Sequence, residues 1–249
     1  MHRLLVESAL LNEEAPVLPA DAAKHLKVLR PKHGEEIELF DGKGRCRKFK
    51  VQSSKFKVEC LIPVSETLNF KHSTLNLTLF ACVTKGSRWD WTIEKATELG
   101  VKRIVPVISD RTIVRIGAEE RAAKRERWAR IAADAARQSD AVWLPEVTMP
   151  VTFAEALALV RETVCFVGAL TEPPSPPLAD ALAAARGETA ADRGDFAVFV
   201  GPEGDFTPAE LEALLAIARP TSFGPAVLRA ETAAIFAVSV VSAWAISAS

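Results

Sequence analysis

Cysteine is scarce in this 249-residue sequence, which has four cysteines and no CxxC pair. Isolated thiols are typical of proteins from a reducing compartment, and we interpret them as buried side chains rather than as disulfides or metal ligands. The longest apolar runs, 75–83 and 235–246, are shorter than the roughly 20 residues of a membrane-spanning helix. The N-terminus also lacks a basic and apolar leader. We therefore expect a cytoplasmic protein with no membrane segment and no metal.

The rest of the composition is that of an ordinary globular protein. Hydrophobic residues make up 49% and charged residues 25% of the chain, which argues against disorder, collagen and coiled coil. The length fits one large domain or two modest ones. The net charge of −1 conceals an asymmetry, because residues 1–149 have 26 basic and 20 acidic side chains (+6) and residues 150–249 have 5 and 12 (−7). Positive charge is thus concentrated in the N-terminal part.

Residues 43–57 contain seven basic residues and no acidic one. Side chains alternate between the two faces of a strand, so this pattern predicts several cations on one face. Two interpretations stay open, namely a patch that contacts nucleic-acid phosphates and a solvated edge strand protected by lysine. A second basic run at 121–137 is predicted as a helix, whose cations form either a solvated face or a binding surface.

The first seventy residues are predicted as short strands around one helix. Asp21 is expected to cap a helix over residues 22–29. Strands are expected at 36–40, 46–52 and 56–62. This spacing is typical of a small β-barrel, and residues 63–73 are interpreted as a linker after it.

From residue 75 onward, apolar strands alternate with helices. The expected strands are 75–83, 103–108, 165–170 and 196–200, and the expected helices are 89–99, 121–137, 153–161, 178–186, 208–218 and 232–246. Apolar strands that alternate with helices are typical of a parallel sheet covered on both faces. We therefore predict an α/β protein with a small β domain at 1–73 and an α/β domain at 74–249.

The sequence Gly-Pro-Glu-Gly-Asp-Phe at 201–206 directly follows an apolar strand and precedes a predicted helix. Loops at the carboxyl ends of parallel strands commonly form ligand sites. The motif is neither the dinucleotide fingerprint nor a Walker loop. The negative charge of Glu203 favours a neutral or cationic ligand over a phosphate. A plain strand-to-helix turn is the alternative interpretation.

Two further segments combine glycine with charge. In residues 222–233, Arg229 is the only basic residue after Arg219 and follows a Gly-Pro loop. Glu231, at the start of the final helix, is expected to complement the helix dipole. In residues 85–101, cations stand at a strand-to-helix junction, and the following carboxylates can form pairs within the helix.

Together these motifs resemble the bacterial 16S ribosomal RNA uracil-N3 methyltransferase family, a branch of the SPOUT superfamily of S-adenosylmethionine enzymes. The N-terminal matches are Val28-Leu29-Arg30 and Leu39-Phe40-Asp41-Gly42. The later matches are Lys85-Gly86, Arg88, Lys95, Glu98-Leu99-Gly100-Val101, Pro106, Gly201-Pro202-Glu203-Gly204, Gly224 and Leu228-Arg229-Ala230-Glu231-Thr232-Ala233. They span nearly the whole chain in the family's order.

The resemblance implies a PUA-like RNA-binding β-barrel at 1–73 and a SPOUT methyltransferase domain with a deep trefoil knot at 74–249. In the family, the donor S-adenosylmethionine lies between three loops of the knot. By this resemblance, the expected donor-binding residues are Leu170, Thr171, Gly201, Pro202, Gly204, Phe223, Gly224, Val227, Leu228 and Thr232. The expected RNA-binding residues are Arg30, Lys43, Arg45, Arg47, Lys48, Lys85 and Arg88. The implied partners are 16S rRNA of the small subunit and a second copy of the chain, with Trp244 of the final helix at the dimer interface.

The implied reaction assigns catalytic roles to Arg229 and Glu203. N3 of uracil lies on the Watson–Crick edge, so the base must be unpaired or flipped out before attack. Arg229 is expected to bind the imide oxygen or the adjacent phosphate. Glu203 is the candidate acceptor of the N3 proton, with the alternative that it only pairs with Arg229.

Three positions depart from the family pattern. Asp205 stands where a third glycine is usual, Ala226 where Arg or Asn is common, and Asp140-Ala141 where the family often has Gly-Arg. The sequence leaves two other functions open. One is a SPOUT methyltransferase that acts on tRNA, and the other is a catalytically silent RNA-binding assembly factor.

Overall fold

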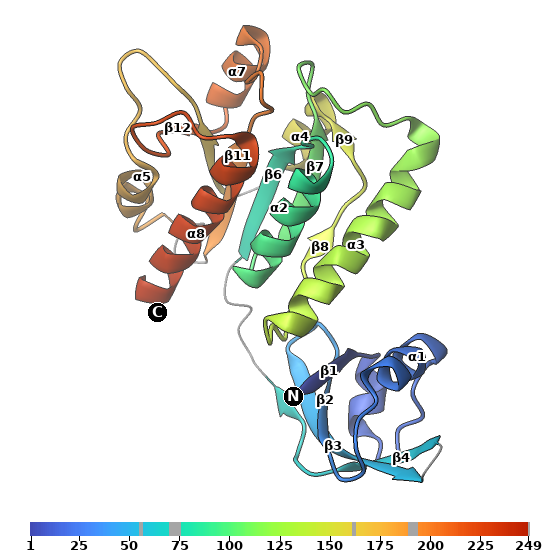
Figure 1. Ribbon diagram of the computed structural model, residues 1–249. Coiled ribbons are helices and arrows are strands. Elements are labelled where there is room, and N and C mark those ends of the chain that lie inside the picture. The colour runs from blue at the N-terminus through green and yellow to red at the C-terminus, as the bar shows by residue number, and fades with distance from the viewer. Residues whose placement is uncertain (55–56, 70–75, 161–162, 189–193, 249) are drawn as a thin grey trace. The chain divides into compact units, whose positions relative to one another are not determined.

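The computed structural model describes residues 1–54, 57–69, 76–160, 163–188 and 194–248 (Figure 1). Lys55 of the basic segment and the end of the expected linker lie outside these residues. The chain divides into two compact units. The first contains Met1–Ser73 and Ala133–Leu144, and the second contains Thr74–Ala132 and Pro145–Ser249. The sequence placed residues 133–144 in the second domain, whereas they pack with the first unit.

The first unit is built on a sheet whose described strands have the order β1-β2-β3-β4, with β5 paired to β3. Its elements are β1 (His2–Leu5), η1 (Ser8–Asn12), α1 (Ala20–Leu29), β2 (Glu36–Phe40), β3 (Arg45–Ser54), β4 (Lys57–Pro63) and β5 (Leu68–Asn69). β1 runs parallel to β2, and the other pairs are antiparallel. The core on one face of this sheet includes Leu4, Ile37, Leu39 and Phe49.

Two expectations for the first unit need correction. The N-cap of α1 is Pro19, so the expected capping role of Asp21 is wrong. Asp21 instead lies in the first turn, where an acidic side chain interacts favourably with the helix dipole. The expected linker contains β5, which pairs with the start of β3. Two residues are too few to show the alternation that predicts a strand.

A buried arginine joins the two chain segments of the first unit. Arg3 is 3% exposed, and its Nε donates to Glu38 Oε1 at 2.7 Å. Its Nη1 donates to the backbone carbonyls of Ala136 and Ala141 at 2.8 and 3.1 Å. The guanidinium also stacks over Phe40, 4.3 Å from the ring centroid. Arg3 therefore fastens residues 133–144 to β1 and β2.

The second unit is an α/β structure, as predicted. Its described strands have the order β12-β10-β11-β6-β7-β8, with β9 paired to β7, and each of these pairs is parallel. Its strands are β6 (Asn76–Cys82), β7 (Arg103–Ile108), β8 (Glu146–Val147), β9 (Val151–Thr152), β10 (Val164–Gly168), β11 (Asp195–Val200) and β12 (Arg219–Thr221). Its helices are α2 (Ser87–Glu98), η2 (Ala118–Glu120), α3 (Arg121–Gln138), α4 (Phe153–Leu159), α5 (Leu178–Ala184), α7 (Pro208–Leu215) and α8 (Ala230–Ala248), and the last turns of α3 belong to the first unit.

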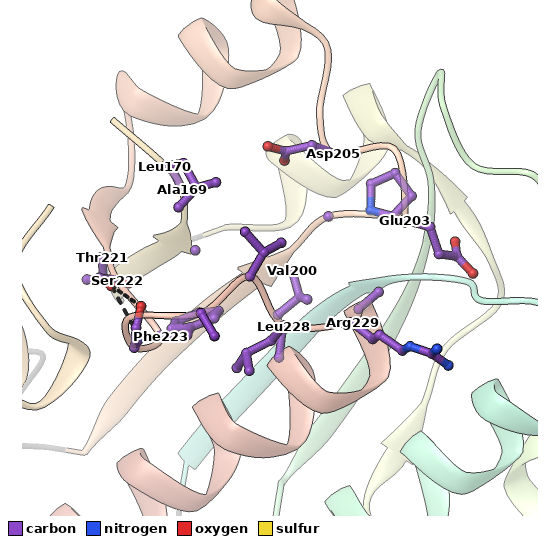
Figure 2. A pocket seen from close by; sticks show the side chains of 18 residues that line it. Ala169, Leu170, Val200, Glu203, Asp205, Thr221, Ser222, Phe223, Leu228 and Arg229 are labelled. Atoms are coloured by element: carbon purple, nitrogen blue, oxygen red, sulfur yellow. Dashed lines mark hydrogen bonds between the residues drawn. The ribbon is translucent and has the colours of Figure 1, made fainter. Parts of the chain in front are cut away.

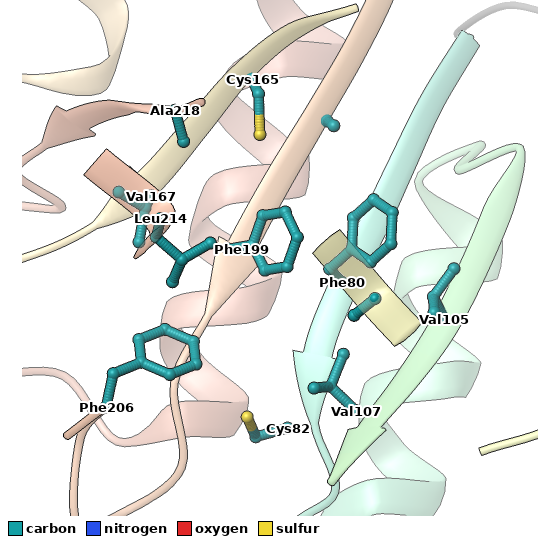
Figure 3. Packing of buried hydrophobic residues seen from close by; sticks show 12 residues of the cluster. Phe80, Cys82, Val105, Val107, Cys165, Val167, Phe199, Phe206, Leu214 and Ala218 are labelled. Carbon is teal, nitrogen blue, oxygen red and sulfur yellow. The ribbon is translucent and has the colours of Figure 1, made fainter. Parts of the chain in front are cut away.

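Apolar side chains cover both faces of this sheet. On one face, the rings of Phe80 and Phe199 stack with centroids 4.4 Å apart and pack with residues of α4 and α7 (Figure 3). On the other face, Phe196 meets Trp244 of α8 edge to face at 5.2 Å. α8 also packs against α2, α5, β6 and β11. The prediction of a parallel sheet covered on both faces is confirmed.

Three cysteines of the sequence are buried and form no disulfide within the described residues. Cys46, Cys82 and Cys165 are free and buried, and burial raises the pKa of Cys82 and of Cys165 to about 12. These thiols are packing residues rather than nucleophiles.

One described helix, α8, is long and apolar enough to span a membrane by length and composition alone. Its contacts with the sheet and two helices instead make it part of the core of the second unit.

Candidate active site

Three chain segments meet at the carboxyl ends of β10, β11 and β12. They enclose a cavity of about 330 Å³ (Figure 2). The lining residues are Gly168, Ala169, Leu170, Val200, Gly201, Pro202, Glu203, Asp205, Thr221, Ser222, Phe223, Gly224, Ala226, Val227, Leu228, Arg229, Ala230 and Ala233. The site thus lies where ligands bind in open parallel sheets.

Most of the residues expected at the donor site line this cavity. They are Leu170, Gly201, Pro202, Phe223, Gly224, Val227 and Leu228, together with the expected catalytic pair Glu203 and Arg229. Three others are not among the lining residues. The Thr171 hydroxyl donates to the carbonyl of Pro173 at 2.7 Å, the Gly204 carbonyl accepts from Arg111 at 2.9 Å, and Thr232 lines a neighbouring groove.

Close packing shapes the cavity wall at Gly168, which the sequence analysis did not single out. A Cβ at Gly168 would lie 2.3 Å from the ring of Phe223. Only glycine therefore lets the loop after β12 approach the end of β10 so closely. A glycine inside a predicted apolar strand, which often marks a close approach of another part of the backbone, was the available signal.

Two side chains hold the loop 201–206 in place. Arg111 Nη1 donates to the backbone carbonyls of Gly204 and Phe206 at 2.9 and 3.3 Å. Glu210 is 6% exposed and accepts from the backbone amides of Asp110 and Thr207 at 2.9 and 2.8 Å. The loop after β11 is therefore fastened to the loop after β7. Sequence reasoning missed Arg111 because it lies 93 residues from Gly204.

Two departures from the family pattern are explained by the backbone. Asp205 and Asp140, at positions where the resemblance predicts glycine, both adopt a left-handed conformation, with φ of 58° and 56°. Asp is among the few residues that tolerate this region. The Asp205 carboxylate also accepts the backbone N–H of Phe206 at 2.7 Å. Both turns keep a glycine-like backbone without glycine.

The alternative that Glu203 pairs with Arg229 is wrong. Glu203 lies 3.6 Å from Arg88 Nη1, so its ion-pair partner is on α2 and is not Arg229. Within the described residues, the guanidinium of Arg229 has no hydrogen bond or ion pair. Figure 2 shows Arg229 and Glu203 on the same side of the cavity, at the opposite end from Phe223. Arg229 is therefore available to a ligand.

The expected RNA-binding cations of the first unit divide between the two faces of β3. Arg47 lies opposite Leu39 and stacks over Phe49, while Lys48 lies opposite Glu38 on the other face. Consecutive residues of a strand point to opposite faces, so β3 carries cations on both faces, and the RNA contact of either face stays a prediction.

Some of these cations already have partners within the first unit. Arg47 is 12% exposed at its side chain, and it donates to the carbonyls of Ser65, Leu11 and Glu13 and to Glu14 Oε1. Arg45 donates to Asn12 Oδ1 at 2.7 Å. Arg30, Lys43 and Lys85 are exposed, and Lys48 is half-buried.

Glu231 is a further candidate that the sequence analysis treated only as a partner of the helix dipole. It lies in the first turn of α8 and is 8% exposed. Its Oε2 accepts no hydrogen bond within the described part of the chain. A carboxylate at the start of an otherwise apolar helix was the available signal. No cluster of side chains among the described residues could hold a metal ion.

Comparisons with known proteins agree with this geometry. Residues 71–242 match the model of an RNA methyltransferase domain, and residues 18–62 match that of an RNA methyltransferase PUA domain. The chain is 32% identical over 235 residues to the ribosomal RNA small subunit methyltransferase E of Bacillus subtilis, covering 92% of this chain and 91% of the relative.

Two solved structures extend the likeness to three dimensions. The S-adenosylmethionine-bound ribosomal RNA small subunit methyltransferase E of Neisseria gonorrhoeae has a TM-score of 0.81 and 28% identity, with 98% of each chain covered. A methyltransferase of Legionella pneumophila with bound S-adenosylmethionine has a TM-score of 0.78, 28% identity and 97% coverage of each chain. The chain belongs to the ribosomal RNA small subunit methyltransferase E family, with an RNA methyltransferase domain preceded by a PUA domain.

Proposed function

We propose that this chain uses S-adenosylmethionine to methylate N3 of a uridine in 16S ribosomal RNA of the small subunit. The observation that supports this most directly is the cavity formed by the loops after β10, β11 and β12, with an unpaired arginine at its rim. Two similar solved methyltransferases, each 28% identical to this chain, contain bound S-adenosylmethionine.

The residues around the cavity fit this donor. Leu170 and Val227 are 73% and 82% exposed although both are apolar, so a bound ligand would cover surface that is otherwise in contact with water. The wall between them is largely apolar side chain and loop backbone, which suits an adenine ring. The donor-binding role proposed here includes Leu170, Gly201, Pro202, Phe223, Gly224, Val227 and Leu228. Thr171 and Gly204 would act by supporting the loops that carry these residues.

The bound donor supplies a methyl group on a positively charged sulfur. We assign Arg229 to an imide oxygen of the target base or to the adjacent phosphate, because its guanidinium is exposed and unpaired within the described chain. A guanidinium fixed beside developing negative charge lowers the barrier electrostatically. Glu203, which lines the cavity, pairs with Arg88 and positions that cation.

Phosphate contacts of the RNA are assigned to the exposed cations Arg30, Lys43 and Lys85, with Lys48 and Arg88. Such contacts give affinity and orientation without reading sequence. Arg45 and Arg47 contribute mainly by shaping the first unit, since their donors are engaged there. A protein with this role acts in the cytoplasm.

The proposal includes a knotted and dimeric second unit. A trefoil knot is supported by the sheet order, in which β12 pairs with the far side of β10 before the chain returns to α8. A homodimer through α8 is supported by Phe236 and Ile246, which are 38% and 71% exposed. Trp244 needs no partner subunit, because it packs against Phe196. Sedimentation equilibrium should give twice the chain mass.

Mapping of methylated nucleotides tests the activity. Ribosomal RNA from a strain that lacks the gene should lose one N3-methyluridine in 16S rRNA, detected by mass spectrometry of nuclease fragments. Expression of this chain should restore it. Restoration of a methyl group in tRNA instead, or no restoration while S-adenosylmethionine still binds, would reject the proposed substrate or the proposed activity, respectively.

A further inference from the structure

A polar groove adjoins the donor cavity and shares Arg229 with it. The groove runs between the start of α2 and the start of α8. It is lined by Ser87, Arg88, Asp90, Trp91, Glu94, Arg229, Glu231 and Thr232. Because Arg229 belongs to both, a ligand in the groove lies next to the rim of the donor cavity.

Among the carboxylates that line the groove, Glu231 is distinguished by an oxygen that has no hydrogen-bond partner within the described residues. Asp90 pairs with Arg127 at 2.7 Å, and Glu94 accepts from Lys95 at 2.8 Å. Glu231 is 8% exposed, and its Oε2 has no hydrogen-bond partner in the described chain. Burying an unpaired carboxylate oxygen costs free energy, which a donor from a ligand would offset.

The other groups in the groove are suited to a planar heterocycle. Trp91 is 41% exposed and lines the groove, and aromatic side chains of this kind can stack on a base. Arg88 and Arg229 provide N–H donors for carbonyl oxygens. The groove therefore combines two guanidinium donors, one carboxylate acceptor and one stacking surface.

We propose that this groove binds an unpaired uracil, with Glu231 accepting the N3–H and the two arginines facing the flanking carbonyl oxygens. The Watson–Crick edge of uracil presents acceptor, donor and acceptor in that order. Cytosine has a ring-nitrogen acceptor at position 3, which a carboxylate repels. This inference rests on the proposed function for the identity of the base and adds the residues that select it.

The test uses the full chain saturated with S-adenosylhomocysteine and three soluble probes. Saturation-transfer NMR gives the affinities for uridine monophosphate, 3-methyluridine monophosphate and cytidine monophosphate. We expect uridine monophosphate to bind at least about tenfold more tightly than the other two, the effect of one hydrogen bond to a charged group. Glu231→Gln should abolish this preference, whereas Trp91→Ala should weaken all three.

Glu212→Gln is the matched control, because Glu212 is an exposed carboxylate on α7 outside the groove. It should keep the preference of the wild type. Equal affinities in the wild type, or an unchanged preference in Glu231→Gln, would overturn the inference. Absence of uridine monophosphate binding, as when a second copy covers the groove, would overturn it too. The affinities of the wild-type protein for the three nucleotides test the inference even if Glu231→Gln fails to fold.

The methylation assay is read separately from these affinities. If the chain methylates 16S rRNA but shows no preference among the nucleotides, only the inference about the groove fails. If the preference is present but 16S rRNA is not methylated, the proposed function fails and the groove remains a uracil site.

Discussion

The interior of the first unit and the donor site of the second unit use arginine in opposite ways. In the first unit, Arg3 and Arg47 are 1% and 12% exposed at their side chains, and their donors are taken up by backbone carbonyls and carboxylates. In the second unit, Arg229 is exposed and unpaired among the described residues, and Arg88 is 40% exposed and 3.6 Å from its carboxylate. Arg3 and Arg47 hold the first unit together, whereas Arg229 and Arg88 at the donor site are available to ligands.

This difference matters because a count of positive charge cannot detect it. A guanidinium has five donors in a planar fork, so it can satisfy several carbonyls at once or bind phosphates and carbonyl oxygens of RNA. Residues 43–57 have seven cations, yet two of them serve the first unit itself. Substitutions distinguish the side chains that stabilise the fold from those that act on ligands.

Replacing Arg3 by methionine should have the largest effect on stability. The variant leaves Glu38 buried without its cation and removes the bonds to residues 136 and 141, so the free energy of unfolding should fall by about 3–5 kcal/mol. Urea denaturation measures it. Arg130→Met, at a side chain that is 77% exposed, is the control and should change stability by less than about 0.5 kcal/mol. A similar small change in Arg3→Met would show that the guanidinium is not structural.

Replacing Arg229 by alanine should leave stability unchanged and reduce methylation. We expect kcat to fall at least about 100-fold, as when one electrostatic donor to a transition state is removed. S-Adenosylmethionine binding, measured by calorimetry, should survive because the cavity wall is mostly apolar side chain and backbone. Near-normal turnover would remove Arg229 from the mechanism.

Two variants distinguish the structural cations of residues 43–57 from those expected to bind RNA. Arg47→Gln should destabilise the protein by about 1–2 kcal/mol, because carbonyls of the first unit lose their donor. Lys43→Gln with Lys48→Gln should leave stability unchanged and reduce the salt dependence of 16S rRNA binding by roughly one ion per lost phosphate contact. Filter binding at several salt concentrations measures this slope. An unchanged slope would show that both lysines are merely solvated.

The smallest effect is expected at Asp205, where the backbone rather than the side chain matters. Asp205→Gly should keep S-adenosylmethionine affinity within about twofold, since glycine adopts the left-handed φ of 58° without strain. Asp205→Ala should lower stability by about 1–2 kcal/mol, the cost of a left-handed residue with a Cβ and no local hydrogen bond. Loss of donor binding in Asp205→Gly would instead assign the carboxylate to the donor.

The local sequence was sufficient to predict an element where its apolar residues form a continuous run or where a glycine marks its end. β7 has the predicted bounds 103–108, because four of its six residues are buried and apolar or proline and pack into the sheet. Gly100 ends α2 with φ of 81°, as expected of a glycine after a helix. In contrast, β8, β9 and β12 have two or three residues each, which is too short for any period to appear.

The sequence by itself determined the alternation of strands and helices, the glycine-bearing loops at the strand ends and the family to which they belong. Only the tertiary structure decided which charges are free. Arg3 reaches residues 136 and 141, Arg111 reaches Gly204, and Glu203 pairs with Arg88 rather than Arg229. Propensity and periodicity act between near neighbours in the chain, whereas an ion pair depends on distances in space that the whole fold establishes.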